Sequence, residues 1–303
     1  MRKLLLILLL SITWSAPMLN AQMRAGTVDI FMGVDLNYRD IAFNNRVFDF
    51  LINLTPGVKW QLPHRWQISA GVLVPVFNQY GDHYKHVRVY NAAVSKQLAL
   101  FGRWRMKVSG GVFGSERYGL DIKNMVIIND WLALTAELGV TGYLSMSSDW
   151  QMSSMKRISG LVGSEFYLNR WNTQLSLRGG RYTYGDYGVM AECMRHFRHV
   201  TLGAYASYNE VTHENVGFKI VVMIPPYKRG NRTVNFRPAS NFRFTYSSRT
   251  DNYANRTYIT DPEENEREGW FDADMLPWGP NTMEPDFTYR DDKDSRKREE
   301  VTK

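Results

Sequence analysis

Side chains able to do chemistry are present in this chain, but their spacing does not form a recognisable catalytic set. Hydrolytic enzymes need a nucleophile, a base and an orienting acid within reach of one another. The chain has no nucleophile elbow, phosphate-binding loop or metal-ligand cluster. Asp82, His83 and His86 share one segment with a spacing that could hold a metal weakly, but a solvated loop is the commoner reading. We therefore expect no enzyme activity, no metal and no cofactor.

A different set of ionisable side chains is placed regularly between apolar ones. Apolar and polar residues alternate with a period of two over most of 28–224, and successive side chains of a β-strand point to opposite faces. The polar face carries charges of both signs at Asp29, Asp35, Lys59, Lys107, Glu137, Glu165, Arg178, Glu192 and Lys219. In a membrane barrel these charges must line the lumen, because an Arg or Lys facing lipid at mid-depth costs about 2–4 kcal/mol.

The elements that must position these charges are about twelve alternating segments between residues 22 and 226, an even number as in single-chain outer-membrane barrels. Their connections also alternate in length. Short ones fall near 62–65, 101–103, 129–130, 169–170 and 198–199, and longer ones at 39–47, 78–86, 144–156 and 209–216, with shorter exceptions near 114–118 and 183–186. Short periplasmic turns and long external loops are typical of outer-membrane barrels. The pattern predicts an all-β fold, an antiparallel up-and-down transmembrane β-barrel of about 12 strands.

Alternation alone does not separate this fold from a soluble lipocalin-type barrel, in which the apolar set points inward. The mixed charges of the polar face and the alternating loop lengths favour the membrane version. An aromatic content of 14% is also typical of girdles at the two membrane interfaces. The single cysteine, Cys193, excludes an internal disulfide and is expected to be a small buried side chain. The net charge of +7 is mild, and we expect no nucleic-acid partner.

Both ends of the chain differ from its alternating part. Residues 1–21 read as a signal peptide, since two basic residues precede an apolar run at 4–12 that is too short for an uncleaved membrane anchor. Residues 22–226 form the predicted outer-membrane barrel. Residues 227–303 are predicted to be a periplasmic tail, partly disordered, with an acidic run at Asp261–Glu264 and mixed charge from 291 to 300.

One stretch resembles a known family. The segment 179–189, GGRYTYGDYGV, resembles the G-R-Y-x-x-G-D-x-G block of the YjbH/GfcD family, and 108–113 with 117–120 resembles another of its blocks. The matching motif residues are Gly180, Arg181, Tyr182, Gly185, Asp186 and Gly188. Gly185-Asp186 suits a tight turn and Gly180 a strand bend, which favours a structural role for the block over direct contact with polymer. The resemblance covers about residues 100–226; full-length members are longer and carry a second barrel half.

Members of that family are outer-membrane barrels tied to exopolysaccharide and group 4 capsule production. The resemblance implies a non-enzymatic barrel in the outer membrane of a Gram-negative cell that assists export or surface assembly of exopolysaccharide or capsule. Its partners would be outer-membrane lipid, a polysaccharide and periplasmic export proteins. Aromatics expected in the outer loops, whose faces stack on sugar rings, are Tyr80, Tyr84, Tyr143 and Tyr184. The alternatives are a small-solute pore and an outer-membrane lipid-modifying or hydrolytic enzyme.

Overall fold

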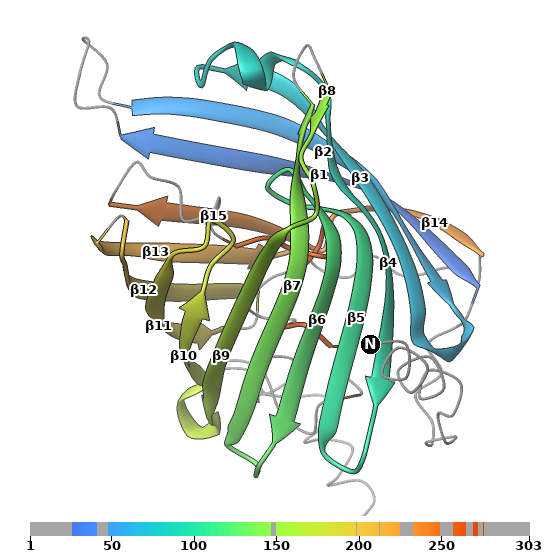
Figure 1. Ribbon diagram of the computed structural model, residues 1–303. Coiled ribbons are helices and arrows are strands. Elements are labelled where there is room, and N and C mark those ends of the chain that lie inside the picture. The colour runs from blue at the N-terminus through green and yellow to red at the C-terminus, as the bar shows by residue number, and fades with distance from the viewer. Residues whose placement is uncertain are drawn as a thin grey trace, which may run out of the picture.

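The computed structural model describes residues 26–40, 48–146, 150–197, 199–211, 213–224, 233–248, 257–264, 269–271 and 275 (Figure 1). The predicted signal peptide and the end of the predicted tail lie outside these residues. The strands are β1 (Thr27–Asp40), β2 (Phe48–Leu62), β3 (Trp66–Asn78), β4 (Arg88–Ala99), β5 (Trp104–Phe113), β6 (Arg117–Ile127), β7 (Leu132–Met146), β8 (Trp150–Met152), β9 (Arg157–Leu168), β10 (Thr173–Arg181), β11 (Tyr187–His196), β12 (Val200–Asn209), β13 (His213–Met223), β14 (Val234–Pro238) and β15 (Asn241–Ser247). Three 3-10 turns are η1 (Pro63–Arg65), η2 (Asp82–Lys85) and η3 (Asn169–Trp171).

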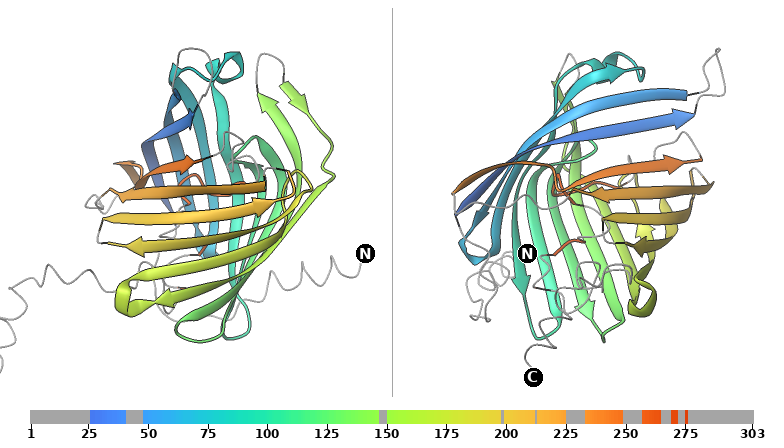
Figure 2. Two further views of the ribbon diagram at one scale, coloured as in Figure 1. Left: turned by 90° about the vertical axis from the view of Figure 1, so that its left-hand side faces the viewer. Right: turned by 180° about the vertical axis from the view of Figure 1, so that it is seen from behind.

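The strands form one strongly curved sheet (Figures 1 and 2). From β1 to β13 each strand pairs antiparallel with the next, with one exception at the short strand β8. Strand β7 pairs with β8 through residues 144–146 and with β9 through residues 132–141. Apart from β8, this makes twelve successive strands between residues 27 and 223. The all-β class and the antiparallel, up-and-down strand order are confirmed. None of the helices in the described part of the chain has the length and apolar character to cross a membrane.

The sheet continues past residue 226, where the predicted barrel ended. Strand β14 pairs parallel with β1, and β15 pairs antiparallel with β13. Only Ala239 and Ser240 separate these two strands, so a single stretch of chain touches both edges of the meander. Ala239 N donates to Met32 O at 2.8 Å, and Ser240 O accepts from Ile224 N at 2.9 Å. Residues 234–247 are therefore part of the sheet rather than of a separate tail.

The sheet buries polar side chains on one face and exposes apolar side chains on the other, the reverse of the usual arrangement in a soluble domain. Strand β6 is typical: Asp121 and Lys123 are at most 1% exposed, whereas Leu120, pointing the other way, is 56% exposed. Large apolar side chains are likewise exposed along neighbouring strands, for example Val162 and Leu138. Cys193 follows the exposed set, so the expectation that it is buried was wrong.

The connections differ between the two ends of the sheet. One end, the turn end, carries only short links between β2 and β3, β4 and β5, β6 and β7, β9 and β10, and β11 and β12. The opposite end, the loop end, carries the longer links 41–47, 79–87 and 147–156. The predicted long loop at 209–216 shrinks to three residues, 210–212, because β12 and β13 extend into it. The predicted asymmetry is confirmed at the turn end and is only partial at the loop end.

Candidate functional site

The charged residues predicted to line an interior all lie on the face of the sheet that carries the buried polar side chains. Several form ion pairs there: Arg178 Nη2 is 2.9 Å from Glu165 Oε1, and Lys219 pairs with Glu192. A cavity of about 340 Å³ opens on this face. The members of the predicted set that line it are Asp35, Glu137, Glu165, Arg178, Glu192 and Lys219. Asp29, Lys59 and Lys107 lie on the same face in β1, β2 and β5.

The C-terminal part of the chain occupies this interior. We call residues 257–275, as far as they are described, the interior segment. Near its start the Tyr258 ring stacks on Phe113 at 5.3 Å, and Ile259 O accepts from Gly114 N at 3.0 Å, both at the loop end. At its far end Met275 O accepts from Arg105 Nε at 2.7 Å, beside the β4–β5 turn. The segment therefore runs along the interior from the loop end to the turn end.

Three carboxylates of the interior segment bind cations on strands that are not neighbours. Lys59 Nζ of β2 lies 2.8 Å from Asp261 Oδ2, and Lys123 Nζ of β6 lies 2.6 Å from Glu264 Oε1. Arg237 of β14 holds Glu263 with two hydrogen bonds of 2.6 Å. This bidentate geometry is the strong form of an arginine–carboxylate pair. One short acidic turn thus ties the segment to three separate strands of the sheet.

The surroundings keep two of these carboxylates, Asp261 and Glu264, charged. Burial opposes ionisation of Asp261, but Lys59 and Lys107, with hydrogen bonds from Lys59 and Gln67, hold the pKa of Asp261 well below its usual range. Burial likewise opposes ionisation of Glu264, and the charges of Lys123 and Lys107 outweigh it, so the pKa of Glu264 is also lowered. The contacts are therefore those of anions bound by cations.

Aromatic and apolar contacts hold the rest of the interior segment. The Trp270 ring lies under two cations, with Lys123 Nζ 5.1 Å and Arg178 Cζ 4.9 Å from its centroid. Such contacts strengthen where water is excluded. Near the turn end Trp270, Phe271 and Met275 form one buried cluster with strand side chains that include Tyr167.

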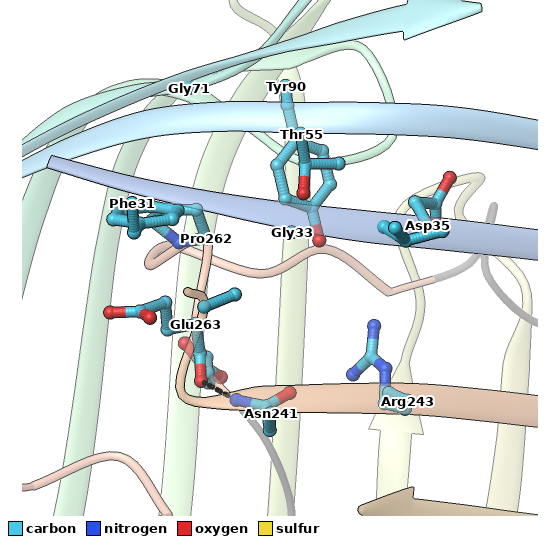
Figure 3. Close-up of a pocket in the computed structure, with 13 residues that line it drawn as sticks. Phe31, Gly33, Asp35, Thr55, Gly71, Tyr90, Asn241, Arg243, Pro262 and Glu263 are labelled. Carbon is cyan, nitrogen blue, oxygen red and sulfur yellow. Dashed lines mark hydrogen bonds between the residues drawn. The ribbon is translucent and has the colours of Figure 1, made fainter. Parts of the chain in front are cut away.

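A small cavity marks the place where β1 faces β15. It has a volume of about 50 Å³ and lies beside the interior segment (Figure 3). Asp35 of β1 lies across the gap from Arg243 of β15, and Asn241 Nδ2 donates to Glu263 O at 3.1 Å. The two strands are in contact but form no strand pair. The interior segment therefore packs against the junction between the two edges of the sheet.

The predicted outer-loop aromatics gather at the loop end. Tyr80 and Tyr84 meet edge to face, with centroids 5.6 Å apart, and the Arg88 guanidinium lies 4.6 Å above Tyr84. His83 Nε2 is 2.8 Å from Glu116 Oε1. Asp82 pairs with Lys85 rather than with either neighbouring histidine. Among the described residues no group of three acids, histidines or cysteines could hold a metal.

A buried arginine organises the other two tyrosines. Arg117 is 1% exposed, and its guanidinium lies 4.9 Å from the Tyr184 centroid and 5.8 Å from that of Tyr143. Tyr143 Oη donates to Glu116 Oε2 at 2.5 Å. Nε and Nη1 of Arg117 have no hydrogen-bond partner among the described residues. The loop end thus combines ring faces with a guanidinium whose donors are not all used.

The residues of the family-like block shape the β10–β11 hairpin. Gly180 and Gly188 face each other across the strands, and a Cβ on Gly180, whose φ is +147°, would lie 2.1 Å from Gly160 O. Tyr182 N donates to Asp186 O at 2.8 Å to close the turn. Arg181 Nε reaches Gly185 O at 3.4 Å.

The other family-like block repeats this arrangement. Gly111 and Gly119 pair across the β5–β6 hairpin with the same spacing, and both have positive φ. The paired glycines of each block therefore have an explanation in backbone geometry.

Comparison with known proteins adds no relative: neither the protein-family models nor the curated proteins give a match to this chain. The family resemblance therefore rests on the two hairpin blocks. Sequence reasoning missed Arg237, Asp261, Glu263, Glu264 and Trp270, because residues after 226 were assigned to a tail. The acidic run facing a polar set that contains several lysines was the available signal.

Proposed function

We propose that this protein is a non-enzymatic outer-membrane β-barrel that assists export or surface assembly of an exopolysaccharide or capsule. The observation that carries the barrel is the sorting of the two faces. Exposing large apolar side chains while burying charges is unfavourable in water, and it is the arrangement that lipid outside and a polar lumen inside would stabilise. Under this proposal the β14–β15 stretch closes the barrel, because it touches both edges of the meander.

The interior segment supports an accessory barrel rather than a free pore. It crosses the interior from the loop end to the turn end, and ion pairs hold it to β2, β6 and β14. The remaining space of about 340 Å³ is lined by charges of both signs. A small-solute pore is the second candidate, favoured by that charged space. We expect the wild-type protein to be silent in a planar bilayer, and a stable open conductance would favour the pore.

The polysaccharide part of the proposal rests on the loop end and on the family resemblance. Tyr80, Tyr84, Tyr143 and Tyr184 surround guanidinium and carboxylate groups there. Aromatic faces stack on sugar rings, and charged side chains next to them can bind hydroxyl or carboxylate groups. Under this proposal the turn end would face the periplasm and any export partners.

The experiment is a clean deletion of the gene, with polysaccharide quantified separately at the cell surface and in the periplasm. Loss from the surface with retention in the periplasm is the expected result. A complemented strain carrying Tyr84→Ala and Tyr184→Ala should show a partial loss, and one carrying Phe101→Ala, an exposed aromatic at the turn end, should not. Unchanged polysaccharide in both places would remove this role. A protein recovered wholly from a periplasmic wash would remove the membrane barrel itself.

A further inference from the structure

We propose that the interior segment occupies a binding site for a linear, carboxylate-bearing saccharide chain, and that its acidic turn stands in for that ligand. This inference rests on the proposed barrel and adds the substrate class. The site is the lysine group on β2, β5 and β6, formed by Lys59, Lys107 and Lys123. The ligand would displace Asp261 and Glu264 and follow the path that the segment now takes.

The first observation is that the site already binds carboxylates. Lys59 and Lys123 each hold one at 2.8 and 2.6 Å, and Gln67 Nε2 donates to Asp261 Oδ2 at 2.6 Å. Carboxylates of a uronic acid present the same acceptors at the same charge, so the lysines and the amide would recognise them by the same hydrogen bonds.

The second observation is a cation that the segment leaves without a direct contact. Lys107 is 3% exposed and makes no hydrogen bond or ion pair with any described residue. Burial opposes its positive charge most strongly, the charges of Glu264 and Asp261 favour it, and those of Lys123 and Lys59 oppose it. A buried ammonium without a direct partner is costly. A ligand with more closely spaced carboxylates would supply one.

The wall near these lysines argues for an exchangeable occupant. Glu137 faces Lys123 across the β6–β7 pair, and Asp121 lies two positions from it but accepts from Tyr258 Oη at 2.9 Å. The wall pairs Glu165–Arg178 and Glu192–Lys219 are complete without the segment. Lys59 and Lys123 each hold a carboxylate of the segment as well. Removing the segment would take one anionic partner from each of them and leave Lys107 still without a direct partner among the described residues, so this part of the wall would attract anions.

The shape of the occupied path selects a linear chain. The segment enters near Gly114 at the loop end and leaves near Arg105 at the turn end. A tethered occupant competes at an effective concentration of about millimolar. Neutralising its carboxylates should therefore strengthen binding of a free acidic chain by at least about tenfold.

The test uses the full chain folded in detergent micelles, with folding checked by the band shift between boiled and unboiled gels. Tetragalacturonate is the probe, maltotetraose the neutral comparison, and calorimetry the readout. The variant Asp261→Asn with Glu264→Gln should bind tetragalacturonate at least about tenfold more tightly than wild type, and salt should weaken the binding. The matched control changes two exposed loop acids instead, Asp82→Asn with Glu210→Gln, and should behave as wild type.

A third variant keeps the test decisive even if the variant with the neutralised turn does not fold. Lys107→Met leaves both ion pairs of the segment intact, so it should fold, and it should abolish the gain when combined with the neutralised turn. If the neutralised turn does not fold, Lys107→Met alone should weaken the wild-type affinity for tetragalacturonate. Equal binding of maltotetraose, no gain over the control pair, or binding of poly-glutamate without tetragalacturonate would each overturn the saccharide site. Binding together with unchanged surface polysaccharide in the deletion strain would leave this site standing and remove only the proposed role.

Discussion

Lys123 and Glu264 lie 141 positions apart in the chain, yet their charged atoms are 2.6 Å apart and their side chains are 1% and 10% exposed. The pair joins the middle of β6 to the interior segment. Burying two charges together is close to neutral when the geometry is good, whereas removing one partner leaves the other uncompensated. This contact therefore reports whether the interior segment is docked as described.

Lys123→Met should destabilise the folded protein by about 3–5 kcal/mol, because Glu264 would remain buried without its cation. The double variant Lys123→Met with Glu264→Gln should recover part of that loss. Guanidinium unfolding in phospholipid vesicles measures both. The control is Lys85→Met, which removes the exposed pair with Asp82 and should change stability by no more than about 1 kcal/mol. Equal effects of the buried and the exposed substitution would contradict the docked segment.

Val162→Arg tests which face meets lipid. Val162 is 66% exposed in the middle of β9, and an arginine at the lipid midplane costs about 2–4 kcal/mol. Trp131→Arg, at an exposed position beside the β6–β7 turn, should cost about 0–1 kcal/mol, since charges near the interface are tolerated. Unfolding in vesicles should show this dependence on depth. If both arginines were neutral, this face would not be embedded.

Gly180→Ala tests the structural interpretation of the family-like block. The new Cβ would lie 2.1 Å from Gly160 O at a φ of +147°, so we expect a loss of at least about 1 kcal/mol and reduced assembly into the membrane. Gly160→Ala is the matched control on the facing strand, because its Cβ would have no neighbour closer than 3.8 Å. The boiled-gel band shift, followed against temperature, measures both variants. Normal assembly of Gly180→Ala with loss of surface polysaccharide would instead give the block a direct functional role.

Acid should release the interior segment only at low pH. The pKa values of Asp261 and Glu264 are lowered in the docked state from ordinary values of 3.8 and 4.5. Groups with depressed pKa values stabilise docking fully above their undocked values, and that stabilisation is lost as the pH falls further toward the docked ones. Planar-bilayer conductance should stay silent from pH 7 to about pH 5 and open only below about pH 4. Opening near pH 6 would contradict the assignment of this release to Asp261 and Glu264.

The sequence predicted the meander because its information is local. In the strands from β1 to β13, apolar and polar residues alternate with a period of two that can be recognised within each strand, and the short turns lie where that alternation is interrupted. The same logic located Glu165 and Arg178 on one face, although their pairing needed the register of β9 against β10. The turn between Gly180 and Gly188 was also predictable, because the glycines carry a backbone requirement of their own.

The interior segment was not predictable in this way. Residues 257–275 have no period, and their polar composition reads as a tail until the cations that bind them are known. Its docking depends on Lys59, Lys123 and Arg237, which come together only after the sheet has curved. The alternation of Phe242, Phe244 and Tyr246 does indicate one more strand, which is β15, but the join that β14 and β15 make between the two edges of the meander was not predictable, for a related reason. Neither β14 nor β15 is long enough alone to compete with the strong alternation of the meander.

The parallel pairing of β14 with β1 also has a mechanical consequence. Strand β15 ends at the loop end, and the described residues of the interior segment lie along the interior between the loop end and the turn end. A force applied at Met275 toward the turn end would be transmitted along the interior segment to β15, the strand that precedes this segment in the chain. The ion pairs that Lys59, Lys123 and Arg237 make with the segment would break one after another as the tension increased. Tension applied at the turn end would therefore load the junction of β1 and β15.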